Sequence, residues 1–151
     1  ARCRMRQFDL GWFAAMVDGE GAISINKTRY STTRSPNRTK YYLQVNVANT
    51  EKELVEPFLT AFGGSIQTAR RNMPRKNEKP VFFWVAGAQK ALKVLEILGP
   101  YFRSSRKRKL ANLGIEFQRQ KTHRRCRDPT YTLEQERFWS ETKRLNKRGI
   151  K

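Results

Sequence analysis

The stretch FDLGWFAAMVDGEGAISI, residues 8–25, changes character twice along its length. Its first part spaces bulky apolar residues at helical intervals, two acids then follow among glycines, and the end alternates apolar with polar residues. The segment DGEG, residues 18–21, suits a turn, so the pattern predicts a helix that ends near Val17 and a strand that begins at Ala22. The rest of the fold can be built outward from this helix, turn and strand.

The predicted helix has one bulky face and one nearly flat face. Phe8, Trp12 and Met16 recur at helical spacing, whereas small residues gather with Asp18 on an adjoining face. Small residues let two helix backbones approach closely, while the bulky face can be buried in a core. We therefore expect a helix shared between two packed bodies, although an ordinary core helix containing alanines has the same pattern. The flat face comprises Gly11, Ala14, Ala15 and Asp18.

Downstream of this stretch, the sequence predicts two β-hairpins, each followed by a helix. Alternating residues predict strands at 22–28 and 41–48 around a flexible basic loop at 29–39. In the first following helix, Pro57 either introduces a kink or marks a regular part that begins nearer Glu56. The remaining predicted elements are strands at 65–71 and 81–86, and helices at about 54–62, 89–98, 105–120 and beyond 132.

This order, αββαββα, predicts the α+β class with a four-stranded antiparallel sheet and further helices at the C-terminal end. A length of 151 residues suits one domain, 1–151, with a sizeable core. The weak apolar stripe of the last helix predicts that it packs peripherally or extends a nucleic-acid contact. The only repeat is the coarse one of two hairpin-helix units, because the acidic helix tip has no second copy.

The charge balance points to a polyanionic partner. Lys and Arg total 32 against 13 Asp and Glu, which gives a formal charge of +19, far more than solubility requires. Nucleic acid is the main candidate, and a membrane surface is the alternative. The basic residues are scattered over strands, loops and helices instead of lining one amphipathic helix, so we expect no membrane contact. With no apolar span of about 18 residues and no cleavable signal, we expect a soluble domain.

The soft metal ligands are few. Cys3, Cys126 and His123 make three, whereas a structural zinc site normally takes four ligands in paired spacing. The sequence therefore predicts neither a zinc site nor a disulfide framework, and the two cysteines fit a reducing compartment.

The acidic tip is the candidate site. Asp18 and Glu20 follow the predicted helix, whose last carbonyl groups already carry partial negative charge, so the acids require a compensating cation. A lysine would serve, and so would Mg²⁺, which favours carboxylate oxygens and bridges to substrate phosphate. A plain polar turn is the simpler interpretation, because Asp and Gly are common turn residues. The residues by themselves leave these interpretations open.

Residues 13–21, FAAMVDGEG, resemble the LAGLIDADG motif, and the predicted αββαββα order resembles the fold of that family over about residues 8–120. The remaining residues, about 121–151, form a C-terminal helical extension. The chain departs from the motif at Phe13, where leucine is usual, at Ala15, where glycine is usual, and at Glu20, where aspartate is more frequent. Glutamate keeps the carboxylate. The chain is most similar to the single-motif, homodimeric homing endonucleases encoded by introns.

The resemblance implies a homodimer in which the motif helices of two subunits pack along a two-fold axis. This packing places one Glu20 from each subunit beside the two scissile phosphates, with Mg²⁺ or another divalent cation held by Glu20 and the Gly19 carbonyl. The resemblance implies three catalytic partners. Asn49 and Lys52 are aligned at the end of the VNVAN strand, and Lys107 precedes the ANL segment at 111–113, which also matches the family. The implied dimer interface comprises Gly11, Trp12, Ala14, Ala15 and Asp18.

The resemblance also implies that each sheet lies as a saddle in the major groove of double-stranded DNA, where alternate polar residues reach base edges. A solvated polar face is the simpler interpretation of those residues. The implied DNA-binding set is Ser24, Asn26, Thr28, Tyr30, Arg34, Arg38, Tyr42, Gln44, Asn46, Gln67 and Arg71.

The leading functional hypothesis is a site-specific double-strand DNA endonuclease that cuts a long pseudo-palindromic site. The alternative from the same resemblance is an RNA maturase that binds an intron and assists its splicing. A general basic RNA-binding or ribosome-associated protein is a third hypothesis, which leaves the acids unexplained. The implied location is intracellular, in a prokaryotic cytoplasm or in the organelle that encodes the intron.

Overall fold

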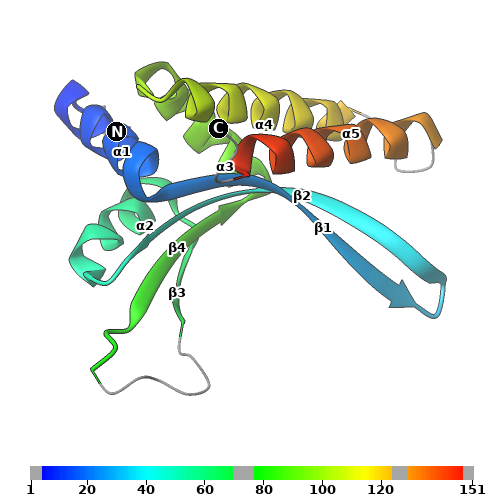
Figure 1. Cartoon of the computed structure of the whole chain (residues 1–151), viewed down its shortest axis with the longest axis horizontal. Coiled ribbons are helices and arrows are strands. Elements are labelled where there is room, and N and C mark those ends of the chain that lie inside the picture. Colours follow the sequence, from blue (N-terminus) through cyan, green and yellow to red (C-terminus); the bar gives the residue numbers. More distant parts are fainter. Residues whose placement is uncertain (1–4, 70–76, 124–128, 148–151) are drawn as a thin grey trace.

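A computed structural model describes residues 5–69, 77–123 and 129–147. Its four-stranded antiparallel sheet carries helices on one face, with the strand order β1-β2-β4-β3 (Figure 1). The predicted α+β class and αββαββα order are confirmed. The elements are α1 Gln7–Glu20, β1 Gly21–Thr32, β2 Ser35–Asn49, α2 Glu56–Phe62, β3 Ser65–Ala69, β4 Val81–Gly87, α3 Ala88–Leu98, α4 Ser105–His123 and α5 Pro129–Asn146, with 3₁₀ turns η1 Lys52–Leu54 and η2 Gly99–Tyr101.

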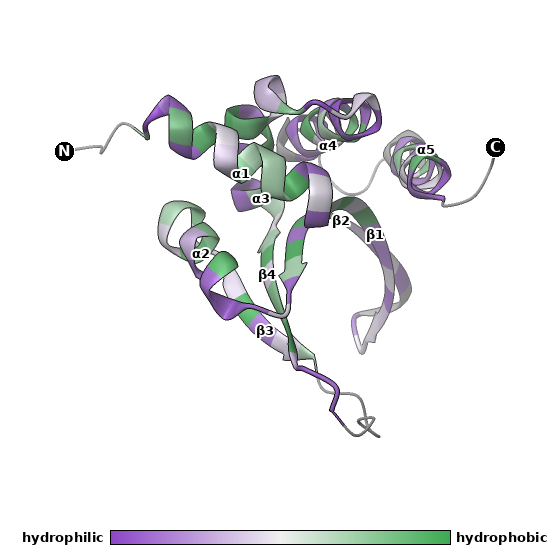
Figure 2. Ribbon diagram, turned by 60° about the vertical axis from the view of Figure 1, so that its left-hand side comes forward, coloured by the Kyte–Doolittle hydropathy of each residue, from purple (hydrophilic) through white to green (hydrophobic). Residues whose placement is uncertain are grey.

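The two faces of the sheet differ. Both hairpins curve away from the helices, so that the uncovered face is concave (Figure 1). In β1, Ile23 and Ile25 are buried under the helices, and the residues between them point to the concave face because side chains alternate along a strand. Figure 2 shows the tip of the β1–β2 hairpin as hydrophilic and β4 as predominantly hydrophobic. The alternation predicted from sequence therefore separates a core face from an open face.

An aromatic cluster fixes α1 and α2 to the sheet. The ring of Phe58 in α2 lies 4.8 Å from the rings of both Phe13 in α1 and Trp84 in β4. The indole Nε1–H of Trp84, which is fully buried, donates to the carbonyl of Gly63 at 2.7 Å. Aromatic rings bury large apolar areas, and a buried indole N–H needs this acceptor. This packing sets the position of the motif helix relative to the central strands.

The α1 helix ends later than predicted. It continues to Glu20 instead of Val17, so the expectation that Glu20 lies past the helix is wrong. The amide of Gly21 still donates to the Val17 carbonyl, and Asp18 Oδ2 accepts from the backbone amide of Arg103 at 2.7 Å. The helical bond at Gly21 and the tertiary contact from Arg103 support a last turn that local glycine content disfavours.

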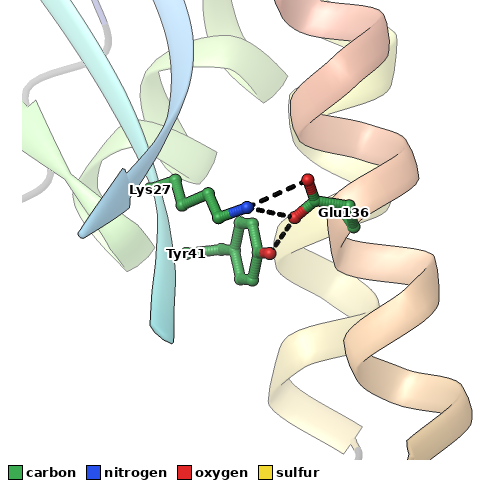
Figure 3. A network of polar contacts seen from close by, with 3 residues as sticks. All are labelled: Lys27, Tyr41 and Glu136. Atoms are coloured by element: carbon green, nitrogen blue, oxygen red, sulfur yellow. Dashed lines mark hydrogen bonds and ion pairs between the residues drawn. The ribbon is translucent and has the colours of Figure 1, made fainter. Parts of the chain in front are cut away.

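The first hairpin is longer than predicted. The segment 29–39, expected to be a flexible loop, is instead paired strand up to a turn at 33–34, with Tyr30 opposite Arg38. This pairing continues the register of the earlier part of β1, against which α5 packs on the helical side of the sheet. Lys27 Nζ lies 2.8 Å from Glu136 Oε2 of α5, and the hydroxyl of Tyr41 donates to the same carboxylate (Figure 3). Helix α5 therefore packs against the sheet, which is one of the two roles expected for the last helix.

The start of α2 is settled by local geometry. Pro57 lies in the first turn of α2, where a missing amide costs nothing, so the regular helix does begin at Glu56. Within the three described ranges, no helix is both long and apolar enough to cross a membrane.

Replacing Glu136 with glutamine should loosen α5 from the hairpin. The hydrogen bond from Lys27, followed by that from Tyr41, holds the pKa of Glu136 below its ordinary value of 4.5. A lowered folded-state pKa adds stability above 4.5 that is lost as pH falls through the folded pKa. Because the pair is partly exposed, we expect Glu136→Gln to lower Tm by roughly 1–3 °C at pH 7 and by less in acid.

Thermal unfolding followed by circular dichroism at several pH values measures this effect. Glu141→Gln is the matched control, because Glu141 pairs with Arg144 inside α5 and leaves the contact with the sheet intact. Equal Tm losses for the two variants at every pH would contradict a clamp at Glu136.

Candidate active site and nucleic-acid interface

The C-terminal end of α1 is held by a lysine from α4. Lys107 is only 5% exposed, and its ammonium donates to the backbone carbonyl of Gly21. Ser104 directly precedes α4, and its Oγ accepts from the amide of Lys107 at 3.3 Å. Carbonyl groups at a helix end carry partial negative charge, which a nearby cation stabilises. A lysine therefore supplies part of the compensation that the acidic tip requires.

The two acids of the tip have different surroundings. Asp18 is half-buried, and its Oδ2 binds the amide of Arg103 while its Oδ1 is buried without a hydrogen-bond partner among the described residues. Glu20 is exposed at the last position of α1. Asp18 thus joins the helix end to the segment before α4, whereas the Glu20 carboxylate is accessible to a ligand.

Glycine is required at the junction between α1 and β1. A Cβ atom at Gly21 would lie 2.7 Å from both the Cα and the carbonyl oxygen of Val17, whereas at Gly19 nothing lies within 4 Å of an added Cβ. Gly21 thus lets the strand leave tightly from the helix end. The Gly19 carbonyl belongs to the last turn, where helix carbonyls lack intrahelical partners and are available as acceptors or ligands.

Asn49 and Lys52 lie just beyond the strand that pairs with this junction. Gly21 is opposite Val47 in β2, so Asn49 is two residues past that pair. The Oδ1 of Asn49 accepts from the amide of Glu51 at 2.9 Å, and exposed Lys52 forms an ion pair with Glu56 at 3.2 Å. The structure thus brings Lys107 to the tip, and shows Asn49 and Lys52 engaged with the segment that follows β2.

The oxygen donors at the tip suit a hard cation. Within the described residues, no three side chains of His, Cys, Asp or Glu form a cluster. Mg²⁺ needs only one or two carboxylates, since it keeps several waters and is completed by substrate phosphate. The Glu20 carboxylate and the Gly19 carbonyl are oxygen donors of this kind. They fit a magnesium ion shared with a phosphate. Cys3 and Cys126 lie outside the described residues.

The exposed face of α1 differs in part from the predicted one. Gly11 and Ala15 are exposed and, with Asp18, line a hollow whose other side includes Pro100 and Tyr101 of η2. Two positions were wrong, because the helix is rotated relative to the expected faces. Ala14 is 1% exposed and belongs to the core, whereas Phe8, expected on the core side, is 82% exposed. Trp12 is half-buried, with its ring 5.8 Å from that of Phe58.

The concave face carries the predicted polar set. Burial of the odd-numbered residues 41–47 of β2 places the even-numbered ones on this face, as in β1. Thr28, Tyr30, Arg34, Arg38 and Gln67 are exposed, and Ser24, Asn26, Tyr42, Gln44 and Asn46 are half-buried. Residues 21–50 contain five Lys or Arg and no Asp or Glu, so every charged side chain of the first hairpin is positive. Arg71 lies outside the described residues.

Sequence reasoning missed some residues of this face. Lys40 is exposed and opposite Thr28, but it lies between the predicted loop at 29–39 and the predicted strand at 41–48, so it was assigned to neither face. Phe83 and Val85 of β4 lie opposite Ala48 and Asn46, so the register places them on the concave face. Because β4 is a continuous apolar run, only the register distinguishes its two faces.

Solved structures share this architecture. The homing endonuclease I-CvuI, in complex with an uncleaved DNA target in the presence of Mg, has a TM-score of 0.75 and 18% identity over 96% of this chain and 85% of its own. The archaeal intron-encoded homing endonuclease I-Vdi141I, complexed with DNA, has a TM-score of 0.72 and 14% identity over 95% of this chain and 87% of its own. The LAGLIDADG homing endonuclease I-SmaMI, bound to cleaved DNA, has a TM-score of 0.58 and 16% identity over 98% of this chain but only 46% of its own.

At these identities the similarity establishes the fold. No protein-family model and no curated protein matches the sequence. The chain therefore has the homing-endonuclease fold that the FAAMVDGEG segment predicted, and its activity has to be argued from its own residues.

A side chain at the helix-strand junction should disturb the tip. Gly21→Ala would force the new Cβ against the backbone of Val17, and we expect a loss of about 1–3 kcal/mol in the free energy of unfolding. Gly19→Ala is the matched control, because it meets open space and alanine favours a helix. Urea denaturation measures both, and equal stability of the two variants would contradict the tight junction.

Proposed function

We propose that this protein is a site-specific DNA endonuclease that makes double-strand breaks with a divalent metal. The observation that carries the proposal is that exposed Glu20 and buried Lys107, whose ammonium donates to the Gly21 carbonyl, lie at the same helix end. In a chain of charge +19, an accessible carboxylate supported by a cation is the arrangement expected for binding a metal together with phosphate.

The concave face supplies the DNA-binding surface in this proposal. A B-DNA major groove about 12 Å wide admits a two-stranded β-ribbon, and amide and hydroxyl side chains can reach base edges there. Arg34 and Arg38 at the hairpin end would contact phosphates, which position the duplex without reading sequence. The fold similarity to I-CvuI and I-Vdi141I, both solved with DNA, supports this docking.

The residues at and near the tip would have different roles in hydrolysis. Glu20 and the Gly19 carbonyl would hold the metal, with Asn49 and Lys52 available to orient the attacking water from the β2 end. Lys107 places positive charge where negative charge grows on the departing oxygen. When bound, Mg²⁺ lowers the pKa of a ligated water and stabilises charge on the phosphate.

A homodimer would supply the two tips that a double-strand break needs. The exposed Gly11 and Ala15 allow a second α1 helix to approach closely, because neither presents a large side chain. The chain also matches only 46% of I-SmaMI, the length expected of one half of a two-site enzyme. Two-fold symmetry then predicts a pseudo-palindromic target.

Removing the Glu20 charge should separate binding from cleavage. Glu20→Gln keeps size and polarity but loses the metal-binding charge, so we expect cleavage to fall about 10³-fold or more while the Kd for target DNA changes only a few-fold. Cleavage rates over a Mg²⁺ titration, with Glu53→Gln as an exposed-acid control, measure the effect. Cutting by the variant at the wild-type rate would refute the metal role.

Enlarging the exposed face of α1 should separate the subunits. Nothing lies within 4 Å of a Cβ added at Gly11, so Gly11→Leu should leave the protomer at least as stable, because leucine favours a helix over glycine. We expect dimer affinity to fall at least 100-fold, with double-strand cutting lost. Sedimentation equilibrium tests this, and Ala61→Gln, on the exposed surface of α2, is a control. A wild-type protein that stays monomeric with DNA would contradict the dimer.

A further inference from the structure

Two amide side chains on the concave face bind each other across the first hairpin. Asn26 Nδ2 donates to Gln44 Oε1 at 2.9 Å, and both residues are half-buried. The register sets Asn26 opposite Tyr42 and Gln44 opposite Ser24, so the amides meet diagonally. Their strands are already paired from Gly21 opposite Val47 onward, so the hairpin does not depend on this side-chain bond.

The pair leaves a defined set of hydrogen-bonding groups. An amide side chain has one carbonyl acceptor and two N–H donors, so Asn26 keeps its Oδ1 and one N–H after bonding Gln44. Adenine presents an N6 donor and an N7 acceptor side by side in the major groove, which an acceptor and a donor on one amide match. The reverse pairing, with Gln44 as donor, leaves Gln44 with the same acceptor and donor. The match to adenine therefore does not depend on which amide donates.

The mutual bond also fixes the planes of both amides before any ligand arrives. Ordering a long polar side chain on binding costs affinity, and this cost is reduced where the side chain is already held. A base edge is read best by a rigid amide, because bidentate hydrogen bonds require both groups to be in one plane with the base. Asn26 and Gln44 are thus organised as one reading unit.

We propose that Asn26 and Gln44 act jointly to specify adenine at one position of each DNA half-site. Asn26 contacts the base, and Gln44 is a positioning residue that orients the Asn26 amide. This inference rests on the proposed DNA-binding function and adds to it the identity of one recognised base and the coupling between two residues.

Selection from a randomised duplex library tests the unit. Wild-type protein, Asn26→Ala, Gln44→Ala and the double variant are each used to bind the library, and bound DNA is sequenced. We expect the wild type to prefer adenine at one position per half-site by about tenfold or more. Both single variants should lose that preference at the same position, and the double variant should lose no more than either single one. Asn112→Ala, an identical truncation on the exposed surface of α4, should retain it.

A base analogue gives an independent readout. Replacing the selected adenine by 7-deazaadenine removes the N7 acceptor, so wild-type affinity should fall several-fold while that of Asn26→Ala stays unchanged. Unchanged base preferences in variants that only lose thermal stability would overturn the inference, as would relaxation of two different positions. Wild-type protein that binds no duplex overturns the proposed function as well, whereas cutting with unaltered preferences overturns this inference alone.

Discussion

The contact between Lys107 and the Gly21 carbonyl is the interaction on which the site depends. It joins α4 to the point where α1 ends and β1 begins, and places a buried cation against the negative end of a helix. Without it, an exposed Glu20 would add charge to an already negative terminus. The fold thus holds the Glu20 carboxylate at a position where its charge is disfavoured unless a cation is near. A carboxylate in such a position favours the binding of a metal ion.

The two faces of the sheet have different roles: one packs against the helices, and the other presents the polar side chains proposed to contact DNA. On the helical side, Lys27 is neutralised by Glu136 and lies 4.6 Å over the ring of Trp139, so this cation serves the packing of α5. On the concave side, amides and hydroxyls form the surface, with arginines near the hairpin end. The same alternation along β1 therefore assigns neighbouring residues to stability and to ligand contact.

Much of the fold could be predicted because it is encoded locally. Helical spacing and strand alternation gave the element order, and the 13–21 segment indicated the fold family. The error at α1 has a tertiary cause, because Arg103 and Lys107 support the helix end. The error at 29–39 arose because the β1–β2 pairing continues through this segment up to the turn at 33–34. The nearness of Lys107 to the tip was predicted only through the resemblance, and the Asn26–Gln44 pair required the register.

The most direct test is to incubate the protein with a randomised duplex DNA library and Mg²⁺ and to sequence the cut ends. A double-strand endonuclease with two related tips should yield paired cuts, one in each strand, within a single pseudo-palindromic sequence. Cut ends should vanish when EDTA replaces the metal. Absence of cut ends above background with Mg²⁺ and other divalent cations, or scattered cuts that share no sequence, would contradict the account.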